Sequence, residues 1–413
     1  MTNFERWHIY TKHLFTPTMW KEAGWLYVIG AALQRRVWYG NLRHWPLFPN
    51  LYIVLVGGPA SGKTLITSAS KSMLGYHKYE PPANTSPAMK ELLRQANDGE
   101  EPLLFPLGPN DITYEALTQT MSRATRTSTI MNDGQEEPYA HASMAFVLSE
   151  LGSLFTRNNE KLPKFTLQTY DCEDYTYKTK HQSTDIIKNS CLSILAGCVP
   201  EFFIEAAHFK IFNDGFVSRC IFLFQERVQD APFHLKEPDQ EQIDCRNHLL
   251  SWIEALSKVA GKLTYGKEIE DYLENWYKTV HLPKEVKATK RMATYYGRKR
   301  VHIQKLAAAF HFSESLDTQL QLGDFTRAIE FLERAEVYMR SGFAVGGRNE
   351  LTPIAKEILR NLRRNGGEWV SKTSLFADYC DDISLQELEE ILIQLQVLGD
   401  VQGKDDHYAA YRK

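Results

Sequence analysis

The stretch at residues 51–64 constrains the fold of this chain more than any other part of it. It reads LYIVLVGGPASGKT, an apolar run rich in β-branched residues that leads directly into a glycine-rich turn. Residues 57–64 fit the pattern G-x-x-x-x-G-K-[ST] without a mismatch. A strand, turn and helix of this kind form a cradle whose backbone N–H groups approach phosphate oxygens. The pattern therefore predicts an α/β fold, with a buried strand before the turn and a helix from near Lys63 to Leu74.

Each part of the cradle has an expected chemical role. The ammonium group of Lys63 would contact the β- and γ-phosphates, and the hydroxyl of Thr64 would ligate Mg²⁺. The positive end of the following helix would face the same phosphates. The residues expected to bind the nucleotide here are Gly57, Gly58, Pro59, Ala60, Ser61, Gly62, Lys63 and Thr64. The predicted cofactors are ATP and Mg²⁺, and a chance match in an ordinary glycine-rich loop is the alternative.

Composition limits the classes of protein to which the chain can belong. Its 413 residues, 43% hydrophobic and 24% charged, suffice for two or three globular domains. A formal charge of -3 gives no general basic field, so any contact with nucleic acid has to come from local segments. The six cysteines form no C-x-x-C pair, which argues against a zinc site and a disulfide framework and predicts a cytoplasmic location. The apolar residues 25–33 are too few to span a bilayer, so no membrane partner is expected.

The first 48 residues are predicted to be largely helical. Apolar residues recur there at spacings of three and four, which favours a helical collar packed on the nucleotide domain. The aromatic residues of this segment could stack on bases, but aromatic stripes at helical spacing favour the core or a subunit interface. Further helices are predicted to start at residues 86–87 and 111–113. Residues 123–137 are predicted to form a polar loop with a turn at 132–134.

A second chemical element is the short apolar run at residues 144–148, which ends in Ser149 and Glu150. In nucleoside triphosphatases of this kind, such a strand is expected beside the cradle strand, with an Asp-Glu pair that holds Mg²⁺ and polarises water. Ser149 stands where the aspartate is expected. Thr64 and, through water, Ser149 are therefore the predicted metal ligands, and Glu150 is the predicted catalytic base. A solvated glutamate at a helix start is the alternative.

Two more strands are predicted later in the chain, at residues 191–196 and 220–224. The first ends near Cys198, at the position where a polar residue normally senses the γ-phosphate. The second follows Arg219, which is predicted to act as an arginine finger on the nucleotide of a neighbouring subunit. A structural salt bridge is the other interpretation of Arg219. Between the strands of Glu150 and Cys198, residues 175–181 carry two lysines at a spacing of two, which suits a β-hairpin arm.

The order of these elements resembles the ring-forming P-loop ATPases of the AAA+ class, especially the phage and mobile-element helicase-like family that often accompanies a primase. The likeness covers about residues 49–345. It is carried by the segments PNLY at 49–52, the cradle at 57–64, LSE at 148–150, GCVP at 197–200 and GFVSR at 215–219. Ser218 and Arg219 before an apolar strand are also similar to the finger motif of minichromosome-maintenance helicases. The chain departs from the family in its acidic pair and in its polar sensor.

The resemblance implies two further roles. The segment at 298–307 looks like a lid helix whose arginine, Arg298 or Arg300, contacts the γ-phosphate. It lies at the end of a basic run, residues 284–300, which could also be only a solvated face. In related ring helicases a hairpin before the sensor strand enters the central channel, so Lys178 and Lys180 are the predicted DNA-binding residues. The alternative is that these lysines only make an exposed hairpin soluble.

The last segment, residues 351–413, is predicted to be a winged helix. Its expected elements are helices at 352–364, 371–380 and 384–398, a short strand at 369–370, and a wing extending through Tyr411. The segment holds eleven acidic residues against eight Lys and Arg. The third helix carries three glutamates and no basic residue, so phosphate repulsion would oppose its entry into a DNA groove. Protein docking or autoregulation is the favoured role.

The predicted architecture is α/β, with an AAA+-like P-loop NTPase core. It consists of a helical N-terminal segment at 1–48, an ATPase core at 49–235, a helical lid at 236–348 and a winged-helix domain at 349–413. The predicted function is an ATP-dependent DNA helicase or translocase of a phage or mobile-element replication system. Its expected partners are single-stranded or forked DNA, further copies in a ring such as a hexamer, and a primase or initiator bound through the C-terminal domain. The alternatives are an ATP-switched replication initiator or scaffold without translocation, and a DNA-packaging-type motor.

Overall fold

The computed structural model is mixed α/β and forms two compact units, Met1–Phe343 and Ala344–Lys413. It describes residues 1–79, 87, 102–110, 112–132, 135–155, 161–177, 185–200, 202, 214–224, 234, 236–286, 288, 290–345, 351–365, 367–380, 383–397 and 400–411. The three segments predicted to precede the C-terminal domain share one hydrophobic core, which extends from Trp7 to Met339. In the described part of the chain no helix is both long and apolar enough to cross a membrane.

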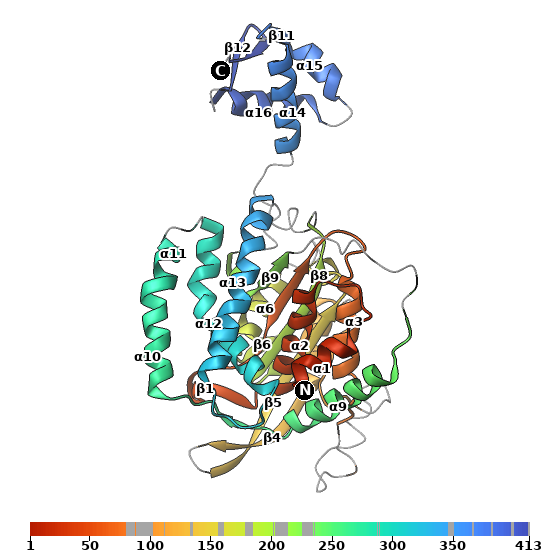
Figure 1. Ribbon diagram of the computed structural model, residues 1–413, viewed down its shortest axis with the longest axis vertical. Coiled ribbons are helices and arrows are strands. Elements are labelled where there is room, and N and C mark those ends of the chain that lie inside the picture. The colour runs from red at the N-terminus through yellow and green to blue at the C-terminus, as the bar shows by residue number, and fades with distance from the viewer. Residues whose placement is uncertain are drawn as a thin grey trace. The chain divides into compact units, whose positions relative to one another are not determined.

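A five-stranded sheet lies at the centre of the first unit, in the order β4-β5-β8-β3-β9 (Figure 1). Its strands are β3 (Tyr52–Val56), β4 (Thr125–Asn132), β5 (Gln135–Leu148), β8 (Ser190–Cys198) and β9 (Ile221–Phe224). All neighbouring pairs are parallel except β4 and β5. The ends of β3, β5, β8 and β9 therefore meet at one edge of the sheet, here called the carboxyl edge, and their starts meet at the amino edge.

The position of β5 in the sheet corrects one prediction. The strand that leads to Glu150 was expected beside the cradle strand β3, but β8 lies between them and pairs with both. The order of strands in a parallel sheet depends on crossover connections, which the local sequence of one strand does not specify. Residues that follow β5 can still reach the cradle, because their strands end at the same edge.

The polar loop predicted at residues 123–137 is also wrong, because these residues belong to α5 and to a long antiparallel hairpin. Strand β4 pairs with β5 from Thr125↔Ala142 to Asn132↔Gln135. The outer part of β5, residues 135–140, is exposed or half-buried, whereas its inner part, residues 141–148, is buried. In β4 the inward side chains Arg126, Ser128 and Ile130 alternate with exposed threonines, but two of the three are polar, so the sequence lacks the apolar alternation that identifies a strand. Residues 133 and 134, which belong to the turn predicted from the sequence, lie outside the described part of the chain.

Two helices, α2 (Thr18–Leu33) and α3 (Lys63–Leu74), lie side by side on one face of the sheet (Figure 1). A Cβ on Gly24 of α2 would lie 2.8 Å from Cγ1 of Ile66 in α3, so glycine permits this close approach. Tyr52 of β3 points to the opposite face, where its hydroxyl donates to the Thr166 carbonyl of α6 (Leu162–Tyr170) at 2.7 Å. The sheet is thus covered on both faces.

The N-terminal segment differs from the predicted collar. Its helices are α1 (Asn3–Tyr10) and α2, and 13 of the 16 residues of α2 are buried. They are followed by strands β1 (Val37–Asn41) and β2 (His44–Leu47), where β1 pairs with β10 (Gly261–Lys262). This pairing with a segment more than two hundred residues away overrides the helical spacing that placed Val37 on a helix. Trp7, Trp20 and Trp25 are fully buried, which confirms the core interpretation for these three residues, whereas Trp45 of the same segment is 97% exposed and lies outside the core.

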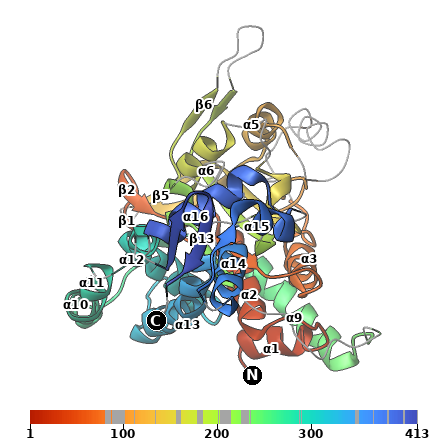
Figure 2. The same cartoon turned by 90° about the horizontal axis from the view of Figure 1, so that it is seen from above.

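The first unit also contains helices and short strands outside the central sheet. The β6–β7 pair lies beside α5 and α6 (Figure 2). The elements are α5 (Tyr114–Arg123), η1 (Leu151–Ser153), β6 (Tyr175–Tyr177), β7 (Asp185–Ile187), α8 (Asp214–Arg219), α9 (Gln240–Leu256), α10 (Lys267–Trp276), η2 (Tyr277–His281), α11 (Leu282–Val286), α12 (Lys290–Phe312) and α13 (Leu322–Val345). Helix α5 begins after Thr113, whose hydroxyl accepts from the Ala116 N–H at 3.3 Å, as its cap pattern predicts. The predicted helix start at residues 86–87 lies almost wholly outside the described residues.

The second unit has its own hydrophobic core and a three-stranded sheet in the order β11-β13-β12. Its elements are α14 (Leu351–Arg364), β11 (Val370–Ser371), α15 (Lys372–Tyr379), α16 (Leu385–Val397), β12 (Val401–Lys404) and β13 (His407–Ala410). These bounds lie close to the predicted ones. The Ser371 side chain caps α15 by accepting from the Ser374 N–H at 3.1 Å.

Candidate nucleotide site

The glycine-rich turn joins β3 to α3 at the carboxyl edge of the sheet, as its sequence predicts. The Gly57 N–H donates to the Cys198 carbonyl of β8 at 3.1 Å, which fixes the start of the turn. Gly62 precedes α3 with φ of 89°, and a Cβ there would lie 2.4 Å from the Phe15 carbonyl oxygen. Glycine is required at this position for both reasons. No side chain caps α3, so its first N–H groups are available to a ligand at the turn.

The side chain of Lys63 folds onto the turn. Its Nζ donates to the Gly57 carbonyl at 2.5 Å, to the Gly58 carbonyl at 2.9 Å and to the Ser61 hydroxyl at 3.5 Å. These three acceptors are uncharged, and a phosphate oxygen would be a stronger acceptor for the ammonium group. A Cβ on Gly58 would meet nothing within 4 Å, so the outer side of the turn is open. The residues present therefore fit a bound phosphate chain.

A close backbone contact brings the second motif to the cradle. A Cβ on Gly197 of β8 would lie 2.2 Å from the Ser149 carbonyl oxygen and 3.3 Å from Cδ of Lys63. Ser149 and Glu150, both exposed, follow β5 directly, and Glu150 is the residue before η1. The structure thus gathers the cradle, Ser149, Glu150 and Cys198 at one edge of the sheet, although their strands are not all adjacent.

Replacement of Gly197 by alanine tests this contact. We expect Gly197→Ala to lower the free energy of unfolding by about 1–3 kcal/mol, because its methyl group would overlap the Ser149 carbonyl. Thermal unfolding measures the loss. The matched control is Gly58→Ala, whose added methyl group meets open space and should leave the midpoint nearly unchanged. An equal fall in midpoint for both variants would contradict the assigned role of Gly197.

The predicted magnesium ligands are hydroxyl groups rather than carboxylates. Thr64 lies exposed in the first turn of α3, and Ser149 lies exposed after β5. Among the described residues no group of three His, Cys, Asp or Glu side chains could hold a metal ion by itself. Mg²⁺ is commonly held by few protein ligands together with substrate phosphates and water. The available residues fit an ion that arrives with the nucleotide.

The predicted sensor, Cys198, contributes its backbone to the cradle. Its side chain is fully buried, and its thiol lies 3.3 Å from the Val199 carbonyl oxygen. Its carbonyl is the acceptor for Gly57. The residue is therefore well placed to fix the turn, and its role as a γ-phosphate sensor stays a prediction.

Arg219 lies at the amino edge, opposite to the cradle. It ends α8 immediately before β9, a strand of four residues that extends about 13 Å toward the carboxyl edge. Its guanidinium pairs with the Asp171 carboxylate and donates to the Gly215 carbonyl at 2.9 Å. Within one chain, Arg219 makes the structural ion pair that was the alternative interpretation. Any contact with a nucleotide would have to involve the cradle of another subunit.

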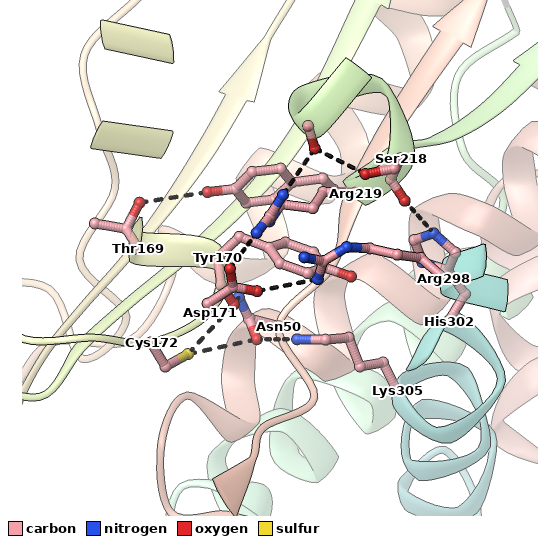
Figure 3. A network of polar contacts seen from close by, with 12 residues as sticks. Asn50, Thr169, Tyr170, Asp171, Cys172, Ser218, Arg219, Arg298, His302 and Lys305 are labelled. Carbon is pink, nitrogen blue, oxygen red and sulfur yellow. Dashed lines mark hydrogen bonds and ion pairs between the residues drawn. The ribbon is translucent and has the colours of Figure 1, made fainter. Parts of the chain in front are cut away.

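The two arginines of the predicted lid contact, Arg298 and Arg300, lie against other residues of this chain. Nη1 of Arg298 lies 3.2 Å from Oδ1 of Asp171, so Arg298 shares the amino-edge carboxylate with Arg219 (Figure 3). The Arg300 guanidinium lies 5.2 Å from the ring centroid of Tyr277. Helix α12 packs against α8 and α2, and this packing directs Arg298 to the amino edge. Arg298 is thus directed away from the cradle of its own chain, and a contact of Arg300 with γ-phosphate stays a prediction.

The amino-edge contacts also join α12 to the start of β3. Lys305 is buried, and its Nζ donates to the Phe48 carbonyl at 2.9 Å and to Oδ1 of Asn50 at 2.5 Å (Figure 3). Burial lowers the pKa of Lys305 to about 8. The pKa of His302, whose Nε2 lies 2.9 Å from the Ser218 carbonyl, is lowered to about 3 by burial. Sequence reasoning missed Asp171, Asn50 and Lys305, because no local pattern joins such distant residues.

The basic run at residues 284–300 is not simply a solvated face. Lys299 is fully buried, and its Nζ lies 2.5 Å from Oε1 of Glu336 in α13. Lys284 pairs with Glu333 of the same helix at 3.0 Å. Charges that looked unopposed in the local sequence are thus compensated by a helix further along the chain. Lys290 and Arg291 belong to α12, whereas residue 287 lies outside the described part of the chain.

The predicted hairpin arm is present as the antiparallel strands β6 and β7, paired from Tyr175↔Ile187 to Tyr177↔Asp185. The two residues predicted to contact DNA, Lys178 and Lys180, lie outside the described residues. Their role stays a prediction from the sequence.

Comparison with known families and curated proteins found no match for this chain. The functional argument therefore depends on the residues of the site and on their arrangement.

Proposed function

We propose that this chain is a ring-forming P-loop ATPase of the AAA+ class that couples ATP hydrolysis to movement along DNA in phage or mobile-element replication. The proposal includes a cytoplasmic location and a winged-helix fold for residues 351–413. It assigns phosphate binding to the turn at 57–64, Mg²⁺ binding to Thr64 and Ser149, and activation of water to Glu150.

One observation carries the proposal, namely the convergence of three separate motifs at the carboxyl edge. Gly197 lies against both Ser149 and Lys63, with room for no Cβ between them. Ligands of open parallel sheets bind beyond the carboxyl ends of the strands. A phosphate cradle beside an exposed carboxylate provides the groups that hydrolysis of a nucleoside triphosphate needs, because positioning and charge stabilisation supply most of the catalysis.

The Mg²⁺ ion would contribute neutralisation of charge that develops on the phosphates. The residues of the chain have separate tasks. Lys63 would hold the β- and γ-phosphates, the N–H groups at the start of α3 would orient them, and Glu150 would accept a proton from the attacking water.

A nucleotide-switched initiator or scaffold is the second candidate, and Ser149 favours it. A hydroxyl replaces the carboxylate expected at this position, so the site has less charge with which to hold a metal ion and should hydrolyse ATP slowly. A protein that binds ATP to assemble on its partners needs slow turnover, whereas a translocase needs repeated turnover.

Hydrolysis assays with and without single-stranded DNA separate the two candidates. For a translocase we expect the ATPase rate to rise by about tenfold or more at saturating DNA, since DNA contacts would commit the ring to turnover. The Lys178→Ala, Lys180→Ala double variant should keep basal hydrolysis and lose this stimulation. Phosphate contacts are salt-dependent, so its DNA binding should also vary less steeply with salt. If DNA does not raise the ATPase rate of the unaltered protein, the nucleotide-switched initiator or scaffold is favoured.

The C-terminal unit is proposed to dock another protein, such as a primase or initiator. Its helix α16 places Leu385 and Ile393 on the surface, with exposed fractions of 46% and 59%. The acidic excess of the segment opposes binding to DNA phosphates. An exposed apolar residue beside carboxylates is better suited to a protein partner.

A further inference from the structure

A cationic cavity lies between β4 and the ends of α2 and α9, away from the nucleotide cradle. It has a volume of about 290 Å³. Its lining residues are Gln34, Arg36, Tyr79, Leu104, Arg126, Thr127, Ser128, Thr129, Ser257, Lys258 and Ala260. Three of these side chains are cationic and none is acidic. We call it the Arg126 cavity.

Arg126 is a buried cation without a carboxylate partner among the described residues. It is 6% exposed, and in β4 it alternates with the exposed Thr125 and Thr127, so it faces inward. Its Nη1 donates to the Thr125 carbonyl at 3.1 Å, and its guanidinium lies 4.8 Å from the Tyr79 ring centroid. Its Nε is buried and has no hydrogen-bond partner. An unpaired buried charge destabilises the folded protein, and a bound anion would supply the missing counter-charge.

The second arginine of the cavity, Arg36, is satisfied by backbone groups. Its guanidinium donates to the Leu256 carbonyl at 3.1 Å and to Oε1 of Gln34 at 2.8 Å, and also to the Ala32 carbonyl. These carbonyls belong to the last turns of α2 and α9, whose ends carry partial negative charge. Arg36 is thereby held rigidly, and Arg126 is the guanidinium with an unused donor. Lys258 lies exposed at the rim and is 3.7 Å from Glu254.

The surroundings of the cavity are also positive. Arg35 is buried and donates to the Tyr139 hydroxyl at 2.7 Å and to the Ser190 carbonyl at 2.9 Å. Burial lowers the pKa of His141, and the charges of Arg36, Arg35 and Arg126 add to this effect and bring it to about 3. His141 is therefore neutral near pH 7 and adds no positive charge of its own. The three guanidiniums create a field that favours an anion.

We propose that the Arg126 cavity binds a phosphate group carried by a nucleotide or a nucleic acid. A guanidinium presents paired N–H donors that match two phosphate oxygens. The Ser128 hydroxyl also lines the cavity, 3.4 Å from Nε2 of His141, whereas the Ser257 hydroxyl donates to the Glu254 carbonyl at 2.6 Å. The site is separate from the cradle, because β5 and β8 lie between β4 and β3 and set these strands about 14 Å apart. It is an additional function and does not depend on ATP hydrolysis by this chain.

Thermal unfolding with inorganic phosphate tests the proposal. The experiment uses the full-length Lys63→Ala protein, so that phosphate bound at the cradle does not contribute, and holds ionic strength constant with chloride. We expect a saturable rise of the unfolding midpoint with phosphate, since a ligand of the folded state stabilises it. Adding Arg126→Gln should weaken the apparent affinity by about tenfold or more, because the charge-assisted bonds are lost. Arg123→Gln is the matched control, since Arg123 is exposed at the end of α5 and should leave the response unchanged.

The outcomes separate specific binding from a general salt effect. Phosphate stabilises many proteins through exclusion from their surface, but that effect would raise the midpoints of the Arg126 and Arg126→Gln proteins equally. An equal rise, or no saturable rise in the Arg126 protein, would overturn the proposal. If Arg126→Gln does not fold, Arg126→Lys keeps the charge without the paired donors, and an undiminished affinity in it would also overturn the proposal.

The molecule that carries the phosphate is identified by comparing different ligands in the same thermal unfolding assay. ADP and a 5′-phosphorylated oligonucleotide are compared with the same oligonucleotide lacking the 5′-phosphate. Arg126-dependent stabilisation by ADP identifies a nucleotide, whereas stabilisation by either oligonucleotide identifies a nucleic acid. Stabilisation only by the 5′-phosphorylated form identifies a terminal phosphate. A failure of this test would leave the ATPase proposal intact, because the cradle is already disabled in the protein used.

Discussion

Replacing Glu150 by glutamine is expected to leave ATP binding intact and to slow hydrolysis by about a hundredfold or more, the usual effect of removing a general base. Glu150 is exposed at the carboxyl edge, and the neighbouring Ser149 contacts Gly197 beside Lys63. The amide retains the size of the side chain but cannot accept a proton from water. Single-turnover hydrolysis and equilibrium binding of a fluorescent ATP analogue measure the two effects separately.

The contrasting variant is Lys63→Ala, which should weaken ATP binding by about tenfold or more, because charge-assisted hydrogen bonds to the phosphates are lost. The two variants therefore separate the contribution of the site to ATP affinity from its contribution to the rate of hydrolysis. Equal turnover in the unaltered protein and Glu150→Gln would remove Glu150 from the role of base and would leave Glu160, the next carboxylate along the chain, as the candidate to test.

Arg219→Ala should bind ATP normally and hydrolyse it about a thousandfold more slowly if Arg219 acts on a neighbouring subunit, since arginine fingers have effects of this size. Mixing it with Lys63→Ala subunits should restore activity. In an equal mixture, about one ring interface in four pairs an intact cradle with an intact finger, because ring interfaces are head-to-tail. The ATPase rate of the mixture, compared with each variant alone, measures this complementation.

The control for Arg219 is Asp171→Asn, which removes the carboxylate shared by Arg219 and Arg298 and keeps both guanidiniums. If the ion pair is only structural, Asp171→Asn and Arg219→Ala should lower the unfolding midpoint similarly and affect hydrolysis alike. If Arg219 contacts a neighbouring nucleotide, Asp171→Asn should retain hydrolysis. Activity that is proportional to a monomeric fraction on dilution would show a site complete within one subunit and contradict the role in trans.

Motifs whose residues lie close together in the sequence were the easiest to predict. The cradle strand, its turn and helix α3 occur at the expected residues, because apolar strand pattern, glycine positions and helix start are all local features. The elements of the C-terminal unit were predicted closely for the same reason. The hairpin β4–β5 was missed because two inward residues of β4, Arg126 and Ser128, are polar, so that burial alternates along the strand but hydrophobicity does not.

The partners of charged residues were the hardest to predict. Lys299, in a run of basic residues, is paired with Glu336 from the next helix, and Arg298 is paired with Asp171, the residue that follows α6. A charge run indicates exposure only if no distant segment supplies the opposite charge. Such a segment is positioned by packing of whole helices, which single residues do not reveal.

The amino-acid sequence by itself determined the glycine-rich turn of this protein, because the required φ at Gly62, the positions of Lys63 and Thr64 and the start of the helix that follows are set within fourteen consecutive residues. Only the tertiary structure decided which other groups meet the cradle. Insertion of β8 between β3 and β5 brings Gly197 against Ser149 and Lys63, whereas α12 carries Arg298 to the opposite edge. Strand order and helix packing depend on the burial of apolar surface across the whole unit. No single segment of the sequence therefore specifies them.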